Sequence, residues 1–276
     1  MSKKKKVTPS FGTMALKTGK PLDLVIIFDT TGSMNPCIDQ LRKNLGDLAK
    51  DLWGNVKNLR VGVISHGDYC DENYCESAVQ KTDLTKDPAV IDKAIREAKG
   101  TGGGDSAEMY ERVLHEVRGF SWRKTANKIV IMFGDDVPHD QNYAKAYNKE
   151  GYDWQVEAKA LADAGIQVNA VKCLNATYSE YFWTGLAKIG NGTYMKLAQF
   201  GNFENVLENV AMAAIFSSSG SKGTTDYLNK KMAEGKISDE SICYLSSNVA
   251  SYSKGDVSYD EGTKTFVPKI TVEVKK

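Results

Sequence analysis

Three short segments of the sequence carry oxygen-bearing side chains that could hold a hard metal ion. They are Asp29-Thr30-Thr31-Gly32-Ser33, the Gly-rich segment 102–105 that ends in Asp105, and the segment that begins Gly134-Asp135-Asp136. No histidine triad and no thiolate cluster stands beside them. A set of carboxylates and hydroxyls favours Mg²⁺, which takes six oxygens and often keeps some of its water, with Mn²⁺ or Ca²⁺ as alternatives.

These segments follow elements that predict where they meet. Residues 22–29 are a nearly continuous apolar run, typical of a strand buried on both faces of a parallel sheet. Further strands are predicted at 59–65, 129–133, 166–173 and 193–197, with another at 77–84. Helical spacing of apolar residues fills the intervals, at 38–52, 91–98, 110–117, 152–164, 179–189 and 203–216.

Strand and helix alternation of this length predicts an α/β fold, a doubly wound and mostly parallel central sheet flanked by helices. In such sheets ligands bind beyond the carboxyl ends of the strands. We therefore expect Asp29, Asp105 and Asp135 to share one rim. The predicted domain covers 21–216. After it come a Ser/Gly linker at 217–223 and a small C-terminal extension to 276, weakly helical at 224–250, with a hairpin at 256–274 turning at 260–262.

The charge of the chain is unevenly distributed. The 276 residues are 41% hydrophobic and 26% charged, which excludes a fully disordered chain, and the net charge is +1. Six lysines and no acid lie in residues 1–20, so the remainder holds 30 basic against 35 acidic residues. We interpret 1–20 as a flexible basic arm outside the fold. Lys3–Lys6 could touch nucleic acid or another acidic surface, and metal binding should not need the arm.

The sequence favours a reducing, cytoplasmic setting. No apolar stretch follows the N-terminal lysines, and no apolar run approaches the ~18 residues of a membrane span. The five cysteines are odd in number and show no disulfide-framework spacing. Cys70 and Cys75 lie close together, but four spacer residues and no second Cys/His pair make them a weak zinc motif.

The chemistry-bearing segments resemble a known family. Asp29-Thr30-Thr31-Gly32-Ser33 is similar to the D-x-[ST]-x-S signature that opens the metal-ion-dependent adhesion site (MIDAS) of von Willebrand factor A domains. The resemblance covers about 21–216. Gly102-Gly103-Gly104-Asp105 stands where the family places its third ligand, as in a Gly-Gly-Gly-Asp subset, and 134–139 is similar to that subset's turn after the fourth strand.

The resemblance implies a role for each matching residue. Thr31 and Ser33 would give hydroxyl oxygens to the metal, Asp29 would bind it directly or through water, and Asp135 would act mainly through water. Asp105 departs from the pattern, since a hydroxyl is commoner there. Its extra charge would retain the metal better and make it a weaker bait for an acidic partner. Beside the metal, the rim could include His66, Asp68, Asp136 and His139.

Plainer roles stand beside these. Asp29 and Asp135 could be turn residues at strand ends. Asp105-x-x-Glu108 precedes an apolar-periodic helix and is typical of a capping box, in which Asp105 would be the N-cap with or without binding metal. His66 and His139 could be packing or turn residues, and Asp136 and Asp140 are typical of turns.

Three functions follow. The first is a magnesium-binding, non-catalytic protein-interaction module, a subunit of a larger intracellular complex, with a partner acid completing the coordination. The family resemblance implies AAA+ ATPases as frequent neighbours.

The second is a haloacid-dehalogenase-type phosphohydrolase, with Asp29 as nucleophile, Ser65 as second-strand hydroxyl, and Asp135 and Asp140 as acidic motif. No lysine in a phosphate-binding context, and no role there for the Gly-rich loop, count against it. The third is a scaffold with a degenerate site.

Overall fold

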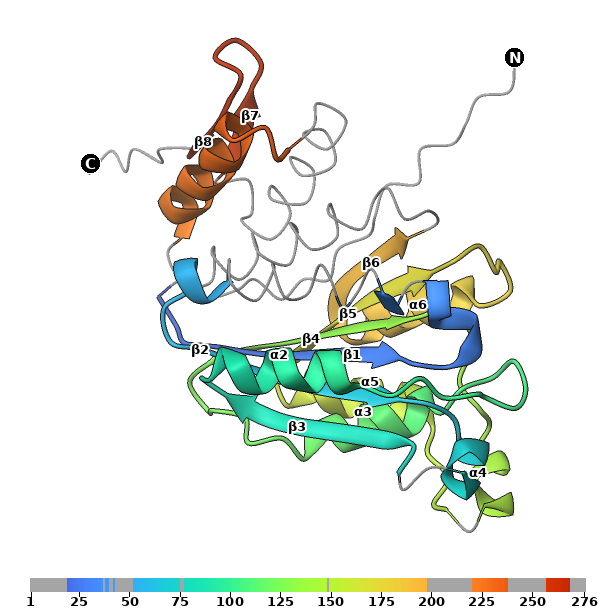
Figure 1. Ribbon diagram of the computed structural model, residues 1–276. Helices are drawn as coiled ribbons and strands as arrows, with labels where there is room; N and C mark the ends of the chain where they lie inside the picture. Colours follow the sequence, from blue (N-terminus) through green and yellow to red (C-terminus); the bar gives the residue numbers. More distant parts are fainter. Residues whose placement is uncertain are drawn as a thin grey trace, which may run out of the picture.

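A six-stranded sheet forms the centre of the chain (Figure 1). The computed structural model describes residues 19–36, 38, 39, 42, 52–74, 77–147, 149–197, 220–237 and 257–268. The strands are β1 Leu22–Asp29, β2 Leu59–His66, β3 Val79–Thr85, β4 Asn127–Gly134, β5 Ile166–Cys173 and β6 Asn191–Leu197. Their spatial order is β3-β2-β1-β4-β5-β6. The chain crosses from one half of the sheet to the other between β3 and β4, so the point where the strand order reverses lies between the neighbouring strands β1 and β4.

All neighbouring strands pair in parallel except β3, which is antiparallel to β2 at one edge. This confirms the predicted mostly parallel α/β fold, and the strand expected at 77–84 is β3. All eight residues of β1 are buried. Alternate residues point to opposite faces of a strand, so Ile26 and Phe28 belong to one hydrophobic core while Val25 and Ile27 belong to the other.

Helices cover both faces of the sheet. α2, Pro88–Glu97, begins at an Asp87 N-cap and packs Ile91 and Ile95 into the core that contains Phe28. α3 Tyr110–Arg118, α5 Trp154–Asp163 and α6 Glu180–Ile189 pack against the opposite core, which contains Ile27. Three shorter elements lie in the loops beyond the strand ends, the 3-10 helices η1 Gly32–Met34 and η2 Tyr69–Asn73 and the single-turn helix α4 Tyr143–Ala146.

The C-terminal extension contributes to the core. Residues 220–233 are helical, and β7 Val257–Asp260 and β8 Thr265–Pro268 form the predicted hairpin, which turns at 261–264. Leu228 and Phe266 are almost fully buried and belong to the same core as Phe28. The predicted linker at 217–223 is therefore wrong from residue 220 onward, because a helix begins there. The apolar side of this helix, which includes Leu228, packs into the core that contains Phe28.

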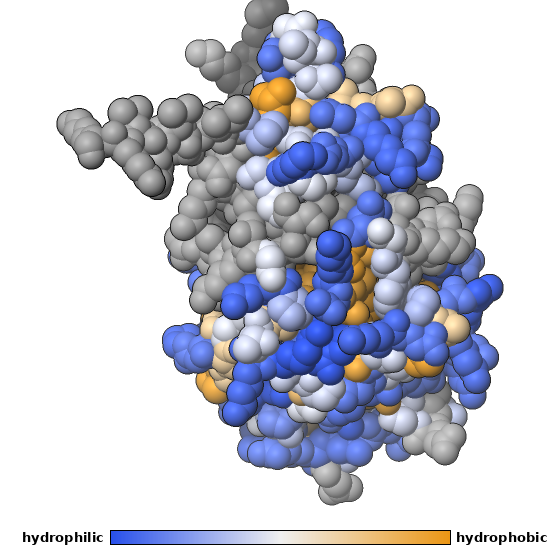
Figure 2. Space-filling view, turned by 90° about the vertical axis from the view of Figure 1, so that its left-hand side faces the viewer, coloured by the Kyte–Doolittle hydropathy of each residue, from blue (hydrophilic) through white to orange (hydrophobic). Residues whose placement is uncertain are grey.

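Several predicted segments lie outside the described residues. They are 1–18, most of the predicted helix at 38–52, the predicted helix at 203–216, and residues 238–256 and 269–276. Figure 2 shows one face of the molecule, on which hydrophilic side chains cover most of the described surface and apolar ones form small areas. No helix among the described residues has the length and apolar character to cross a membrane.

A buried carboxylate closes the amino-terminal edge of the sheet. Asp23, at the start of β1, is fully buried. Arg60 on β2 donates to both of its oxygens, at 2.9 and 2.8 Å, and Arg123 donates from its backbone N–H and from Nε, at 2.8 and 2.9 Å. Burial alone would raise the pKa of Asp23, but the two arginines outweigh it and hold that pKa below its usual value.

Candidate functional site

The candidate site lies at the opposite, carboxyl-terminal edge of the sheet, where β1 and β4 end side by side. Phe28 pairs with Phe133 in the parallel register, so Asp29 and Asp135 follow neighbouring positions. The backbone N–H of Gly32 donates to the carbonyl oxygen of Gly102 at 3.3 Å, which brings the Gly-rich loop to the same edge. The three segments that the sequence singled out therefore meet, as expected for strand ends of an α/β sheet.

Asp29 is fully buried, and both of its oxygens accept hydrogen bonds. Oδ1 accepts from the backbone N–H of Thr31 at 2.7 Å and from its hydroxyl at 2.6 Å. Oδ2 accepts from the hydroxyl of Tyr110, the first residue of α3, at 2.6 Å. Asp29 therefore fixes the position of Thr31 and is itself held by α3.

Hydroxyls connect Asp29 to Asp135. The Thr31 Oγ1 lies 3.4 Å from the Ser33 Oγ, and Ser33 donates to Asp135 Oδ1 at 3.2 Å. Tyr110 adds a second link, since its hydroxyl oxygen accepts from the backbone N–H of Asp135 at 3.2 Å. Four of the five predicted metal ligands, Asp29, Thr31, Ser33 and Asp135, are therefore joined in one hydrogen-bonded chain.

Glu108 joins this group, and the sequence did not single it out as a ligand. It is only 3% exposed, its Oε2 is buried without a hydrogen-bond partner, and a Cβ added to Gly103 would lie 3.4 Å from its Oε1 and 3.5 Å from Thr31 Cβ. Its backbone is fixed against the turn after β4, because its N–H donates to the carbonyl of Val137 at 2.9 Å. The only sequence signal was its place after the Gly-rich loop, which we interpreted as half of a capping box.

The electrostatics of these carboxylates are unfavourable without a cation. Burial, followed by repulsion from Asp29, raises the pKa of Asp135 to about 6. Burial and the charges of Asp29 and Asp68 raise the pKa of Glu108 well above its usual range. Among the described residues, no lysine or arginine forms an ion pair with Asp29, Glu108 or Asp135. Buried Lys172 on β5 is near enough for its charge to act on Asp135, but its Nζ faces the carbonyl oxygens of Cys173 and Leu174. Three buried acids that form no ion pair with a described lysine or arginine fit a site built for a metal ion.

Asp105 lies in a different environment from the other predicted ligands. It is exposed, and its Oδ2 accepts from the hydroxyl of Tyr143 at 2.7 Å. The capping-box interpretation is wrong, because α3 begins at Tyr110 with Met109 at the N-cap position, four residues after Asp105. The chain from 105 to 109 is drawn instead toward the turn after β4, where Glu108 bridges to Pro138.

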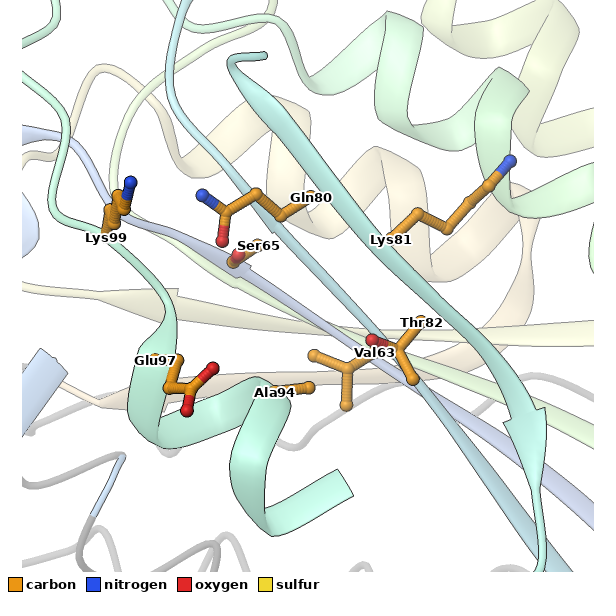
Figure 3. A pocket seen from close by; sticks show the side chains of 8 residues that line it. All are labelled: Val63, Ser65, Gln80, Lys81, Thr82, Ala94, Glu97 and Lys99. Atoms are coloured by element: carbon orange, nitrogen blue, oxygen red, sulfur yellow. The ribbon is translucent and has the colours of Figure 1, made fainter. Parts of the chain in front are cut away.

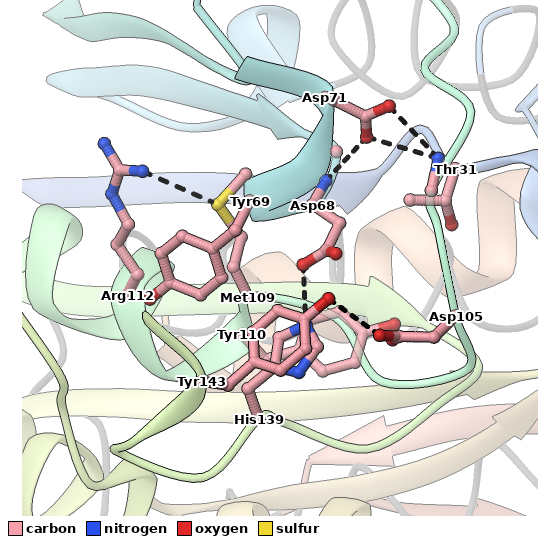
Figure 4. A network of polar contacts seen from close by, with 12 residues as sticks. Thr31, Asp68, Tyr69, Asp71, Asp105, Met109, Tyr110, Arg112, His139 and Tyr143 are labelled. Carbon is pink, nitrogen blue, oxygen red and sulfur yellow. Dashed lines mark hydrogen bonds and ion pairs between the residues drawn. The ribbon is translucent and has the colours of Figure 1, made fainter. Parts of the chain in front are cut away.

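The four predicted rim residues have different surroundings. His66 is buried, packs edge-on against the Tyr110 ring at 5.4 Å between centroids, and has Nδ1 3.0 Å from the carbonyl oxygen of Gly67. Asp136 accepts a hydrogen bond from Tyr178, and burial raises its pKa. Asp68 and His139 pair with each other, Oδ1 to Nε2 at 2.7 Å (Figure 4). His66 is thus an internal support, whereas the other three lie in the loops around the site.

The Gly-rich loop is fastened by a residue that the sequence did not reveal. One carboxylate, that of Asp71 in η2, accepts from the backbone N–H of Gly102 at 3.0 Å and of Gly103 at 3.2 Å. Gly103 has φ +68°, a conformation that L side chains rarely adopt. The loop conformation therefore depends on glycine at this position and on Asp71.

Two other features singled out in the sequence are Ser65 and the pair of Cys70 and Cys75. Ser65 lines a cavity of about 550 Å³ between β2, β3 and α2, with Gln80, Glu97 and Lys99 (Figure 3). The hydroxyl that the phosphohydrolase hypothesis needs beside Asp29 therefore belongs to that cavity. Burial raises the pKa of the Cys70 thiol to about 12, so it is protonated at neutral pH, and Cys75 lies outside the described residues.

The fold and the carboxylate-lined rim define an α/β domain with a candidate metal site at the ends of its parallel strands, and comparison with known families identifies the domain. The model of the von Willebrand factor type A domain matches residues 23–209. The chain belongs to this family. The narrower resemblance to a Gly-Gly-Gly-Asp subset stays a prediction.

Similar proteins are distant and longer. The chain is 24% identical over 132 residues to the alpha-protein kinase vwkA of Dictyostelium discoideum, covering 47% of this chain and 20% of that protein. It is 23% identical over 248 residues to a putative ariadne-like RING finger protein of Acanthamoeba polyphaga mimivirus, covering 85% and 24%. The chain thus spans a quarter or less of the length of these two relatives.

Solved structures share the fold. The pilus adhesin SpaC from Lactobacillus rhamnosus GG, in an open conformation, matches with a TM-score of 0.56 and 17% identity, over 74% of this chain and 31% of its own. Proximal thread matrix protein 1 from the mussel byssus, with a zinc-occupied MIDAS motif, matches with a TM-score of 0.52 and 17% identity, over 72% and 47%.

Proposed function

We propose that this chain is a MIDAS-type protein-interaction module that binds one divalent cation, Mg²⁺, and uses it to hold a protein partner. The observation that carries the proposal is the group of buried carboxylates and hydroxyls at the ends of β1 and β4, in which Asp29, Glu108 and Asp135 form no ion pair with a described lysine or arginine. Its donor set is all oxygen, which favours Mg²⁺, with Mn²⁺ or Ca²⁺ as alternatives.

Each residue has a distinct part in the proposed site. Thr31 and Ser33 would offer hydroxyl oxygens, and Asp135 and Glu108 would offer carboxylate oxygens. Asp29 already accepts hydrogen bonds on both oxygens, so it would position Thr31 and bind through water. The bound ion would supply a coordination position for an acidic side chain of the partner. Glu108, rather than Asp105, would be the extra acid that retains the ion.

The surroundings of the site support a partner of protein nature. Tyr178 is 56% exposed and donates to Asp136 beside the site, and Tyr74, after η2, is 88% exposed. Exposed tyrosines beside a polar centre are typical of protein-binding surfaces. A larger intracellular complex, an AAA+ ATPase neighbour and a cytoplasmic location belong to the same proposal, and they rest on the family resemblance.

The arrangement favours binding over catalysis. Asp29 has no exposed surface, and both oxygens that could attack a phosphoryl group already accept hydrogen bonds, from Thr31 and from Tyr110. Ser65, the second residue of the phosphohydrolase hypothesis, lines the separate cavity beside α2. We therefore propose a non-catalytic role for the site.

Calorimetric titration of the full chain tests the proposal. Mg²⁺ and Mn²⁺ are titrated into the wild type, Asp29→Asn, Glu108→Gln and the matched control Asp163→Asn, whose carboxylate pairs with Lys159 on the exposed face of α5. We expect one ion bound by the wild type and the control, and binding at least ~10-fold weaker in the other two. Equal binding by all four proteins would contradict the metal site.

A parallel assay with an aryl phosphate separates binding from catalysis. We expect no turnover with Mg²⁺ present. Turnover that disappears in Asp29→Asn would establish the phosphohydrolase instead. Affinity capture of partners from a lysate, with Mg²⁺ or with EDTA, then tests the interaction role. Partners retained with Mg²⁺ and released by EDTA are expected for the wild type and not for Asp29→Asn.

A further inference from the structure

A second group of metal-ligating side chains lies in the loops around the proposed Mg²⁺ site. Asp68 follows β2, Asp105 ends the Gly-rich loop, and His139 follows β4. One ligand atom from each lies within 4.8 Å of the other two. Figure 4 shows the three side chains converging from three different segments, beside the ring of Tyr143.

Asp68 has a carboxylate oxygen without a strong hydrogen-bond donor. The residue is fully buried and its Oδ1 lies 2.7 Å from His139 Nε2, while its Oδ2 is buried and the only further side-chain donor that faces this carboxylate among the described residues is the weak thiol of Cys70. A buried carboxylate oxygen that has lost water and gained only a weak donor is costly. Since the same carboxylate faces an imidazole nitrogen and another acid, a cation between them would satisfy it.

His139 and Asp105 are both held in position by contacts within the loops that carry them. The imidazole of His139 stacks on the Tyr143 ring at 3.7 Å between centroids, and its backbone N–H donates to Glu111 Oε2 at 3.2 Å. The Tyr143 hydroxyl donates to Asp105 Oδ2. Tyr143 therefore orients both a nitrogen and an oxygen ligand. Asp105 is exposed, which leaves the group open to solvent on one side.

We propose that Asp68, Asp105 and His139 form a second divalent-cation site, selective for a zinc-like ion. One neutral imidazole and two carboxylates balance a 2+ charge and leave a fourth position for water, the donor set of an open zinc site. Tetrahedral ligands at ~2.1 Å from zinc stand roughly 3.4 Å apart, so small side-chain rotations close the group. An ion bound at Nε2 of His139 takes the place of the proton there, and the ring stays neutral because its one proton then sits on Nδ1.

The selectivity of the two sites should differ because their donors differ. The group around Asp29 offers only oxygens, which favours Mg²⁺, whereas an imidazole nitrogen favours Zn²⁺ and Co²⁺. The proposal does not rest on the proposed function, since none of its three ligands belongs to the hydrogen-bonded chain from Asp29 to Asp135.

Cobalt titration of the full chain tests the second site. The protein is stripped with EDTA, dialysed, supplied with excess Mg²⁺, and titrated with Co²⁺ while visible absorption is recorded, and with Zn²⁺ by calorimetry. We expect one equivalent of Co²⁺ with d–d absorption typical of nitrogen and oxygen ligands. Binding should weaken ~100-fold in His139→Gln and in Asp105→Asn, whose side chain is exposed and whose fold should persist.

Matched variants decide between the two sites. His115→Gln changes an imidazole that lies in the last turn of α3 and stacks on Tyr152. Asp163→Asn changes an exposed carboxylate on α5. Both variants should keep Co²⁺ binding. Ser33→Ala should lose Mg²⁺ affinity and keep Co²⁺. Co²⁺ binding that survives in both His139→Gln and Asp105→Asn, that is lost in Ser33→Ala, or that shows thiolate charge-transfer absorption would overturn the proposal. Absence of micromolar binding would do the same.

Discussion

Two buried aspartates of one strand, Asp23 and Asp29, stand at opposite ends of β1 and are stabilised in opposite ways. Asp23 lies among the guanidinium groups of Arg60 and Arg123. Asp29 accepts only hydroxyl and backbone N–H groups, and its charged neighbours Glu108 and Asp135 are acids as well. The comparison distinguishes a structural carboxylate, which has its cation in the sequence, from one whose cation must come from solution.

The largest expected effect on the free energy of unfolding is at Asp23, whose cations are supplied by the protein itself. Asp23→Asn should lower the free energy of unfolding by about 3 kcal/mol, with or without Mg²⁺, because it leaves two partly buried arginines without their shared anion. Urea unfolding measures it, with Asp163→Asn as the control that should change it by less than ~0.5 kcal/mol. Equal losses in the two variants would remove the contrast between the ends of β1.

At the Asp29 end of β1, the free energy of unfolding should depend on whether Mg²⁺ is bound. At a Mg²⁺ concentration 100 times Kd, the wild type should gain ~2.7 kcal/mol of stability over the EDTA-treated protein. Glu108→Gln should be about 2 kcal/mol more stable than the wild type in EDTA at pH 7, because the raised pKa of Glu108 means that folding must protonate this carboxyl, a cost that glutamine does not carry. It should lose most of the gain from Mg²⁺. A destabilised Glu108→Gln in EDTA would show that the site is satisfied without a metal.

Acid should remove the stabilising contribution of the paired aspartate, Asp23. The pKa of Asp23 is lower in the folded than in the unfolded chain, so its stabilising contribution is complete above the unfolded value of about 4 and is lost as pH falls through the folded value. In EDTA, the slope of unfolding free energy against pH below 4 should be smaller in Asp23→Asn than in the wild type, by at most ~1.4 kcal/mol per pH unit. Equal slopes would mean that the arginines do not hold the charge.

The smallest expected effect is none. Deletion of residues 1–20 should leave Mg²⁺ affinity unchanged, since the described contacts of the site begin at Asp29 and the backbone bond from Asn127 to the carbonyl of Pro21 remains. Calorimetry compares the two chains. A weaker site after deletion would mean that the basic arm reaches the acidic end of β1.

The sequence predicted the residues whose place follows from strand order. A buried apolar run fixes β1, and the carboxyl ends of parallel strands share an edge, so Asp29 and Asp135 could be brought together without any knowledge of the loops. Their hydroxyl neighbours Thr31 and Ser33 follow directly in the chain. The same reasoning gave the hairpin at the C-terminal end, where alternation and a turn are local signals.

The missed residues depend on the path of loops. Glu108 enters the site because its backbone bonds to the turn after β4, a contact between residues about 30 positions apart that has no local signature in the sequence. Tyr110 stands in the apolar stripe of α3, and its hydroxyl bond to Asp29 is visible only once α3 is docked. Asp105 was expected beside them, yet the same bend of the chain that brings Glu108 inward leaves Asp105 exposed beside Tyr143.

The hydrogen bonds from Gly102 and Gly103 to Asp71 bear on whether this loop could bind a phosphate group. Gly-rich loops of nucleotide-binding proteins offer their backbone N–H groups to phosphate oxygens. Here two of those groups, from Gly102 and Gly103, already face the carboxylate of the chain itself. The Asp71 carboxylate thus occupies the position that a phosphate would take. A triphosphate would have to displace this carboxylate, and the two negative groups would repel each other. The glycines of this loop allow close packing around Asp71, and the N–H groups of Gly102 and Gly103 already have their anion in that side chain.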